Sequence, residues 1–209
     1  MSRMQVMAST DIPLFPLPAV IMPGGILPLR IFEARYIDMI GRCMKNNTGF
    51  GICAIKQTSR AGGAAVQALS DIFDIGTLVK IVDFESLPDG LLGITVIGEC
   101  KFRVLSIWQQ QDALRMANIE RIPLEMPVKI AHENKLLSEL LQRIMPDVEK
   151  LYGREPLRFL KNNFEDAGWV GSRLLEFLPI PLEVKQSLLE CVDPLERLTR
   201  LRDVVQSVQ

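Results

Sequence analysis

The residues that could perform chemistry are few and widely spaced. His132 is the only histidine of the 209-residue chain, and no cysteine or second histidine lies at ligand spacing from it. An isolated imidazole does not make a zinc site, because zinc needs several protein ligands. A nucleophilic Cys–His pair would need a thiol folded against His132, an alternative that sequence spacing leaves open. We therefore interpret His132 as a structural residue and expect no catalytic residue, no metal and no cofactor.

The cysteines also favour a structural role, because they are far apart and form no Cys-x-x-Cys motif. This pattern is typical of reduced, buried thiols. The N-terminal segment has no apolar core of signal-peptide length, and no later run approaches the roughly eighteen apolar residues of a membrane span. We expect a cytoplasmic protein without membrane contact. The four cysteines are Cys43, Cys53, Cys100 and Cys191.

Composition predicts a globular protein without general affinity for polyanions. Hydrophobic residues make up 48% of the chain and charged residues 23%, and the net charge at pH 7 is −1. Glu99 and Glu120 interrupt the densest basic stretch, and aromatic residues for base stacking are not interleaved with it. We interpret this stretch as a solvated face and do not expect nucleic acid as a partner. Its basic residues are Lys101, Arg103, Arg115 and Arg121.

The elements that would position these residues begin with a proline-rich stretch. Prolines lack a backbone N–H, so the short pieces Ile12–Leu14 and Leu27–Ile31 are predicted at sheet edges or strand ends. Gly24-Gly25 predicts a tight turn. Helical periodicity then predicts one amphipathic helix over residues 32–46. Its buried face would contain Phe32, Tyr36, Met39, Ile40 and Cys43.

Residues 50–122 have the composition of β-strands. Asp89-Gly90 predicts a hairpin turn, and the apolar return strand Leu91–Ile97 is expected to be central in the sheet and to end at Gly98. Gln57–Leu69 is predicted to be a surface loop. The other predicted strands are Phe50–Ile55, Thr77–Phe84, Glu99–Trp108 and Ala113–Ile122.

After Pro123 and Pro127 the period becomes helical, so we place a boundary there, between a β subdomain (10–124) and a helical subdomain (125–209). A stripe from Leu137 to Leu151 predicts a long helix, bent at Pro146. Asp193 before Pro194 is a helix N-cap. The expected fold class is α+β. The shorter predicted helices are Glu155–Phe164, Trp169–Leu178, Pro181–Cys191 and one from Pro194 towards Val208.

Three ordered strings near the N-terminus carry a family resemblance. They are Pro13-Leu14-Phe15-Pro16-Leu17, Met22-Pro23-Gly24 and Leu27-Pro28-Leu29-Arg30-Ile31-Phe32-Glu33-Ala34-Arg35-Tyr36. Together they resemble the opening of the N-terminal, substrate-binding domain of Lon proteases. With weaker likenesses at Gly76-Thr77, Gly98 and Leu178-Pro179-Ile180-Pro181, the resemblance extends roughly from Asp11 to Leu201.

The resemblance implies a PUA-like β pseudo-barrel crossed by one helix and followed by a C-terminal helical bundle. It also implies a protein that binds unfolded or partner polypeptide. Of its characteristic residues Pro28, Phe32, Glu33, Arg35 and Tyr36, we interpret Glu33 and Arg35 as fixing the helix start to the barrel.

A Lon protease adds an ATPase and a Ser-Lys peptidase to this kind of domain. The chain has no Gly-Lys pair and hence no phosphate-binding loop of the G-x-x-x-x-G-K-[ST] type. We expect its C-terminus to leave no room for a peptidase. The resemblance therefore predicts a non-catalytic domain.

Apolar residues at predicted turns and strand ends are the candidates for a peptide-contact surface. Two alternatives stay open: a small hydrolase using the cleft between the subdomains, and a PUA-like RNA-binding module. The oligomeric state is undetermined. The candidate contact residues are Met22, Pro23, Leu87, Leu91 and Trp108.

Overall fold

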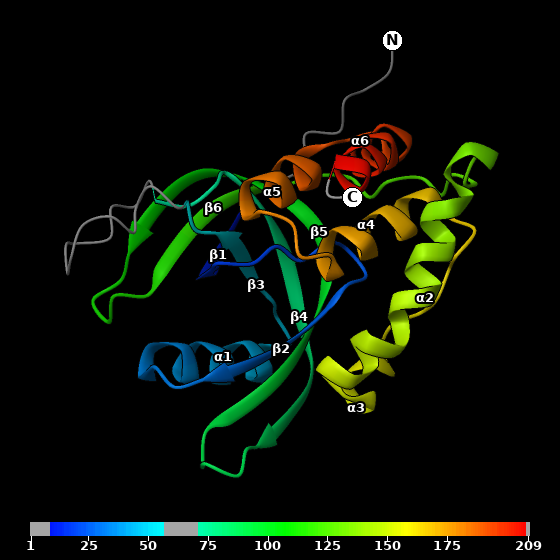
Figure 1. The fold of residues 1–209 in the computed structure, drawn as a ribbon. Coiled ribbons are helices and arrows are strands. Elements are labelled where there is room, and N and C mark those ends of the chain that lie inside the picture. Colours follow the sequence, from blue (N-terminus) through cyan, green and yellow to red (C-terminus); the bar gives the residue numbers. More distant parts are fainter. Residues whose placement is uncertain (1–8, 57–70, 208–209) are drawn as a thin grey trace.

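The computed structural model describes residues 9–56 and 71–207 and has the predicted α+β fold (Figure 1). The predicted loop Gln57–Leu69 lies outside these residues. The sheet has six strands: β1 (Thr10–Leu17), β2 (Ile26–Ile31), β3 (Phe50–Ala54), β4 (Ile75–Ser86), β5 (Leu92–Gln109) and β6 (Arg115–Arg121). The helices are α1 (Ala34–Asn46), α2 (Lys135–Tyr152), α3 (Arg154–Leu157), α4 (Ala167–Phe177), α5 (Leu182–Glu190) and α6 (Pro194–Ser207).

The sheet closes on itself. Its order is β2-β5-β4-β3-β1-β6, and an additional β5–β6 pairing completes a ring from which only β2 is excluded. β1 and β3 are parallel, and the other pairs are antiparallel. β2 runs along the first half of β5, while β6 takes the same edge along its second half. The result is the expected pseudo-barrel.

The prolines explain how β1 joins two neighbours. Its first half, containing Pro13, pairs only with β6, and its second half, containing Pro16, pairs only with β3. Leu14 alone pairs with both. Each proline therefore has one unpaired side, where its missing N–H costs no ladder bond. β1 is an interior strand of the ring, which differs from the predicted edge position of Ile12–Leu14, although each proline has a partner strand on one side only. The predicted edge position of Leu27–Ile31 is confirmed, because β2 pairs only with β5.

The prediction that Gly98 ends a strand is wrong, since β5 continues through it from Leu92 to Gln109. On the neighbouring strand β4, Leu78 pairs with Cys100 and Val79 pairs with Gly98. Glu99 therefore has no partner on β4 and is the extra residue of a β-bulge. A Cβ at Gly98 would lie 2.2 Å from the Met22 carbonyl oxygen. Glycine is needed here because another chain segment crosses the strand.

Helix α1 crosses the barrel and buries Met39, Ile40 and Cys43. The helix starts two residues later than predicted, and Phe32, at 71% exposure, does not belong to the buried face. Phe32 precedes the helix, so helical periodicity does not fix its direction. Arg35 pairs with Glu33 at 2.5 Å and donates to the Ala113 carbonyl at 2.9 Å, which ties the helix start to the β5–β6 turn.

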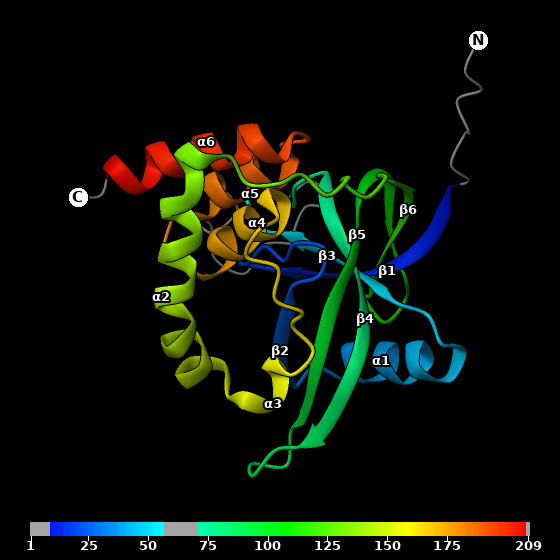
Figure 2. The same cartoon turned by 90° about the vertical axis from the view of Figure 1, so that its right-hand side faces the viewer.

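Helices α2 to α6 form a layer on one side of the barrel (Figure 2). Their core includes Val20, Met22, Ala54 and Ile75 from the barrel side. The expected division into subdomains at residue 124 stays a prediction. The Asp193 cap is present, with its carboxylate accepting from the Leu195 N–H at 2.9 Å.

Two helical details differ from the prediction. Helix α3 spans only Arg154–Leu157 instead of Glu155–Phe164, and the chain up to Asn163 is irregular. Leu151, at the end of the predicted stripe, is 80% exposed. Pro146 lies inside α2 without ending it. The stripe is buried at Leu137, Leu141 and Val148, where α2 has neighbours to cover it.

Candidate functional site

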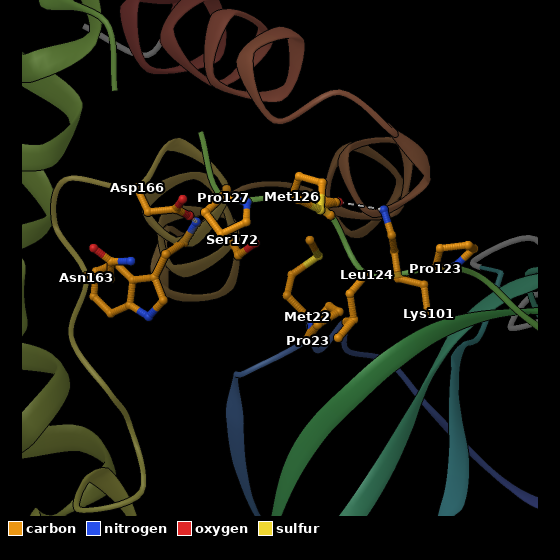
Figure 3. A pocket seen from close by; sticks show the side chains of 13 residues that line it. Met22, Pro23, Lys101, Pro123, Leu124, Met126, Pro127, Asn163, Asp166 and Ser172 are labelled. Atoms are coloured by element: carbon orange, nitrogen blue, oxygen red, sulfur yellow. Dashed lines mark hydrogen bonds and ion pairs between the residues drawn. The ribbon is translucent and has the colours of Figure 1, made fainter. Parts of the chain in front are cut away.

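A pocket of about 250 Å³ lies where the barrel meets the helical layer (Figure 3). Lys101 of β5 and three segments line it: the turn Met22–Gly25, here called the junction turn; the segment Pro123–Pro127, here called the linker; and α4 with the residues before it. Most of the lining side chains are apolar. The lining residues are Met22, Pro23, Lys101, Pro123, Leu124, Glu125, Met126, Pro127, Asn163, Asp166, Gly168, Trp169 and Ser172.

The junction turn is held to the barrel by backbone hydrogen bonds. The Gly24 N–H donates to the Gly98 carbonyl at 2.8 Å, and the Gly98 N–H donates to the Gly25 carbonyl at 2.9 Å. Gly24 has a φ of 72°, a left-handed conformation that glycine adopts without strain. The turn therefore has a fixed place beside the middle of β5.

On its other side the junction turn contacts a buried ion pair of α4. Arg173 Nε and Glu176 Oε2 are 2.8 Å apart. Glu176 also accepts from the Met22 N–H at 2.6 Å, and Arg173 donates to the Pro23 carbonyl at 3.3 Å. Burial raises the pKa of Glu176 to about 7, against the opposing effects of Arg173 and the Met22 N–H. This pair sets the distance between two walls of the pocket.

The linker is anchored from both sides through Glu125. Lys101 of β5 donates to the Glu125 carboxylate at 2.8 Å, and Arg197 of α6 binds both of its oxygens. Burial alone would raise the pKa of Glu125, but these hydrogen bonds outweigh it, so the pKa is lowered. Lys101 also donates to the Leu189 and Cys191 carbonyls, at 3.1 Å each. The linker is thus fixed to barrel and helices together.

Two side chains on either side of Glu125 form the exposed rim of the pocket. Leu124 is 64% exposed and Met126 is 79% exposed. Across the pocket, Trp169 packs edge-to-face on Phe164 with ring centroids 5.0 Å apart. The Asp166 carboxylate caps α4 by accepting from the Trp169 N–H at 2.7 Å, which fixes the helix turn that carries the indole.

The structure separates the contact residues predicted from the sequence. Met22 and Pro23 line the pocket, but Met22 is fully buried, so its expected exposure is wrong. Leu87 and Leu91 lie by the β4–β5 hairpin turn, at the end of the barrel that is distant from α4, α5 and α6 (Figure 1). Trp108 lies at the opposite end of β5 and is 37% exposed. These residues do not form one surface, because the junction turn contacts the middle of β5 rather than its hairpin end. Whether Leu87, Leu91 or Trp108 contacts polypeptide stays a prediction.

Sequence reasoning missed Leu124, Met126 and Trp169. The linker was interpreted only as a boundary, although its two prolines enclose two apolar residues separated by one glutamate. That alternation in an extended segment was the available indication. Trp169 was placed on a helix without any indication of what it faces.

The described residues offer little for bond chemistry. None of their His, Cys, Asp and Glu side chains form a group of three or more that could hold a metal ion. Burial raises the pKa of Cys43, Cys53, Cys100 and Cys191, that of Cys53 to about 12, which disfavours a thiolate nucleophile. The pocket's Lys101 and Glu125 are paired with each other. Among the same residues, no helix combines the length and the hydropathy of a membrane span.

The basic stretch is not the solvated face that the sequence predicted. Arg103 and Arg121 are exposed, but Lys101 and Arg115 are buried, at 4% each. Arg115 forms a bidentate pair with buried Asp71, at 2.5 and 3.0 Å. Lys101 and Arg115 are held inside the fold by their ion pairs with Glu125 and Asp71, so the four cations do not form a continuous basic stripe.

Comparison with known proteins gives relatives along nearly the whole chain. The Lon protease of Cytophaga hutchinsonii is 24% identical over 196 residues, covering 91% of this chain and 23% of that protein. The Lon protease of Escherichia coli K12 is 25% identical over 200 residues, covering 94% and 25%. The chain spans about a quarter of the length of the curated relatives it matches.

Solved structures show the same architecture. A Lon N-terminal domain protein from Xanthomonas campestris matches with a TM-score of 0.73 and 29% identity, over 93% of this chain and 98% of that one. The N-terminal domain of the Mycobacterium avium complex Lon protease, with a TM-score of 0.57 and 18% identity, covers 93% and 97% and shows a likeness of fold. The family model for the ATP-dependent protease La (LON) substrate-binding domain matches residues 11–207, so the chain belongs to the Lon substrate-binding domain family.

Proposed function

We propose that this protein binds unfolded polypeptide without bond chemistry, and that the pocket between junction turn, linker and α4 receives apolar side chains of the bound chain. The family description, a substrate-binding domain of a protease, supports a polypeptide ligand. We place the protein in the cytoplasm, as expected from its sequence.

The observation that carries this proposal is the exposed apolar rim beside an apolar pocket. Leu124 and Met126 remain 64% and 79% exposed although they lie beside a pocket lined by Met22 and Trp169. A volume of about 250 Å³ is below the roughly 300–1,000 Å³ of sites for small molecules, so one large side chain fits it better than a metabolite does. Methionine adapts its shape to different partners, which suits clients that share no sequence.

Tryptophan fluorescence gives a direct test, because the chain has only two tryptophans. In a Trp108→Phe variant, Trp169 is the remaining reporter, and it lines the pocket. Titration with an unfolded, tryptophan-free polypeptide should change its emission, whereas the same polypeptide in its folded form should not. An unchanged Trp169 signal despite binding detected by another method would place the client elsewhere.

Substitution of the rim tests the energetics. Leu124→Ser with Met126→Ser should weaken binding by roughly 1–3 kcal/mol, the scale of burying one or two apolar side chains. Leu151→Ser is the matched control, because Leu151 is equally exposed, at 80%, but does not line this pocket. Equal effects of the rim pair and the control on binding would contradict the proposal.

A further inference from the structure

The linker backbone is unpaired at its centre. In the part of the chain that the structure describes, no hydrogen bond involves the N–H or carbonyl groups of Leu124, Glu125 or Met126. On one side, the Ile122 N–H donates to the Lys101 carbonyl at 2.8 Å. On the other, the Val128 N–H donates to Asp166 at 3.0 Å and the Val128 carbonyl accepts from Ala167 at 2.7 Å. A short free segment thus lies between two fixed ends.

The free segment has the features of a strand. Prolines at 123 and 127 disfavour helical backbone in the residues that precede them. The side chains of Leu124 and Met126 are exposed while Glu125 between them is anchored inward, which is the alternation of an extended chain. The ion pairs of Glu125 with Lys101 and Arg197 hold the segment in place before any ligand arrives. The fold already orders this segment, so the segment loses little conformational entropy when a ligand binds.

An extended segment with unpaired backbone groups is a template for one more strand. We propose that Leu124–Met126 pairs by backbone hydrogen bonds with an extended stretch of the client polypeptide, while an apolar client side chain enters the adjoining pocket. This inference rests on the proposed function and adds to it the conformation of the client. Backbone pairing is independent of sequence, so it suits clients that have only the peptide bond and scattered apolar residues in common.

The geometry limits which client groups take part. In an extended segment, N–H and carbonyl groups of residues i and i+2 point to the same edge, so Leu124 and Met126 offer theirs together. A client strand at that edge uses alternate residues in the same way. The ligand class is thus an extended peptide with free amides at alternate positions and apolar side chains, and a helical or proline-rich segment is excluded.

N-methylation of a peptide removes single amide donors and tests this pairing without altering the protein. A labelled peptide with alternating leucine and threonine is compared with variants methylated at one backbone nitrogen each, by fluorescence anisotropy. Methylation at alternate positions should lower affinity about 2- to 10-fold, the worth of one hydrogen bond, and methylation between them should have less effect. Uniform loss or no loss, with the parent peptide binding, overturns the pairing but leaves the proposed function. A parent peptide that does not bind overturns both.

Met126→Pro compared with Met126→Ala isolates the donor on the protein side. Both variants remove the methionine side chain, but only proline removes the N–H, which makes no internal hydrogen bond among the described residues. Both should melt at the same temperature. We expect Met126→Pro to bind the parent peptide several-fold more weakly than Met126→Ala, and to lose the alternating response to N-methylation. Equal affinity with an unchanged response overturns a role of the Met126 N–H and the pairing proposed here.

Discussion

Replacing Gly98 by alanine should displace the junction turn. The new Cβ would lie 2.2 Å from the Met22 carbonyl oxygen and 3.2 Å from Pro23 Cα, both of them backbone atoms that no side-chain rotation can move away. The φ of Gly98 is not in the left-handed region, so alanine meets no intrinsic strain there. Any effect of the substitution therefore reports the contact between β5 and the turn.

The magnitude follows from the contacts that the shift breaks. The shift should break two backbone hydrogen bonds, from Gly24 to Gly98 and from Gly98 to Gly25, which are 2.8 and 2.9 Å long. Their loss costs together about 1–3 kcal/mol, and partial exposure of Met22, now fully buried, adds up to about 2 kcal/mol. We expect the free energy of unfolding to fall by roughly 2–4 kcal/mol in urea denaturation. Client binding measured with Trp169 should weaken as well, because Met22 and Pro23 line the pocket.

Gly41→Ala is the matched control. Gly41 is exposed within α1, and apart from its chain neighbours and the backbone of its own helix no described atom lies within 4 Å of a Cβ placed there. Alanine should raise stability by about 0.5–1 kcal/mol through helix propensity, without effect on binding. A change in the free energy of unfolding of less than about 0.5 kcal/mol for Gly98→Ala, the usual scatter of surface substitutions, would refute the predicted displacement of the junction turn.

Three further outcomes are expected. Asp71→Asn breaks the buried bidentate pair with Arg115 and should cost roughly 3–5 kcal/mol in urea denaturation; a cost below about 1 kcal/mol would contradict this. The folded-state pKa of Glu176, raised to about 7 by burial, exceeds the unfolded value, so the stability contributed by its protonated form is complete below the unfolded pKa and is lost as pH rises through about 7. The free energy of unfolding contributed by Glu176 should therefore fall as pH rises from about 4.5 to about 7, and Glu176→Gln should remove this part of the pH dependence; an unchanged pH dependence in Glu176→Gln would contradict the raised pKa. Phe32→Ser should change the free energy of unfolding by less than about 0.5 kcal/mol because Phe32 is 71% exposed, and a larger loss would show that it packs against the fold.

The sequence by itself determined the features that depend on neighbouring residues. Pro28 predicted an edge strand and β2 pairs only with β5, Asp89-Gly90 predicted the hairpin turn, and Asp193 predicted the helix start. The change from strand to helical period predicted the α+β class. The ordered strings near the N-terminus identified the family correctly.

Only the tertiary structure decided which surfaces face each other. Glycine is typical of strand ends, but at Gly98 the junction turn crosses β5. The contact joins Gly98 to Met22, which lies 76 positions earlier in the sequence. The same contact buries Met22, while Phe32 stays exposed because none of the described elements covers it. Periodicity shows which residues of one element share a face, but not which other element covers that face. The pocket forms from segments near residues 22, 125 and 169, so its existence follows from the closure of the fold and not from any local pattern.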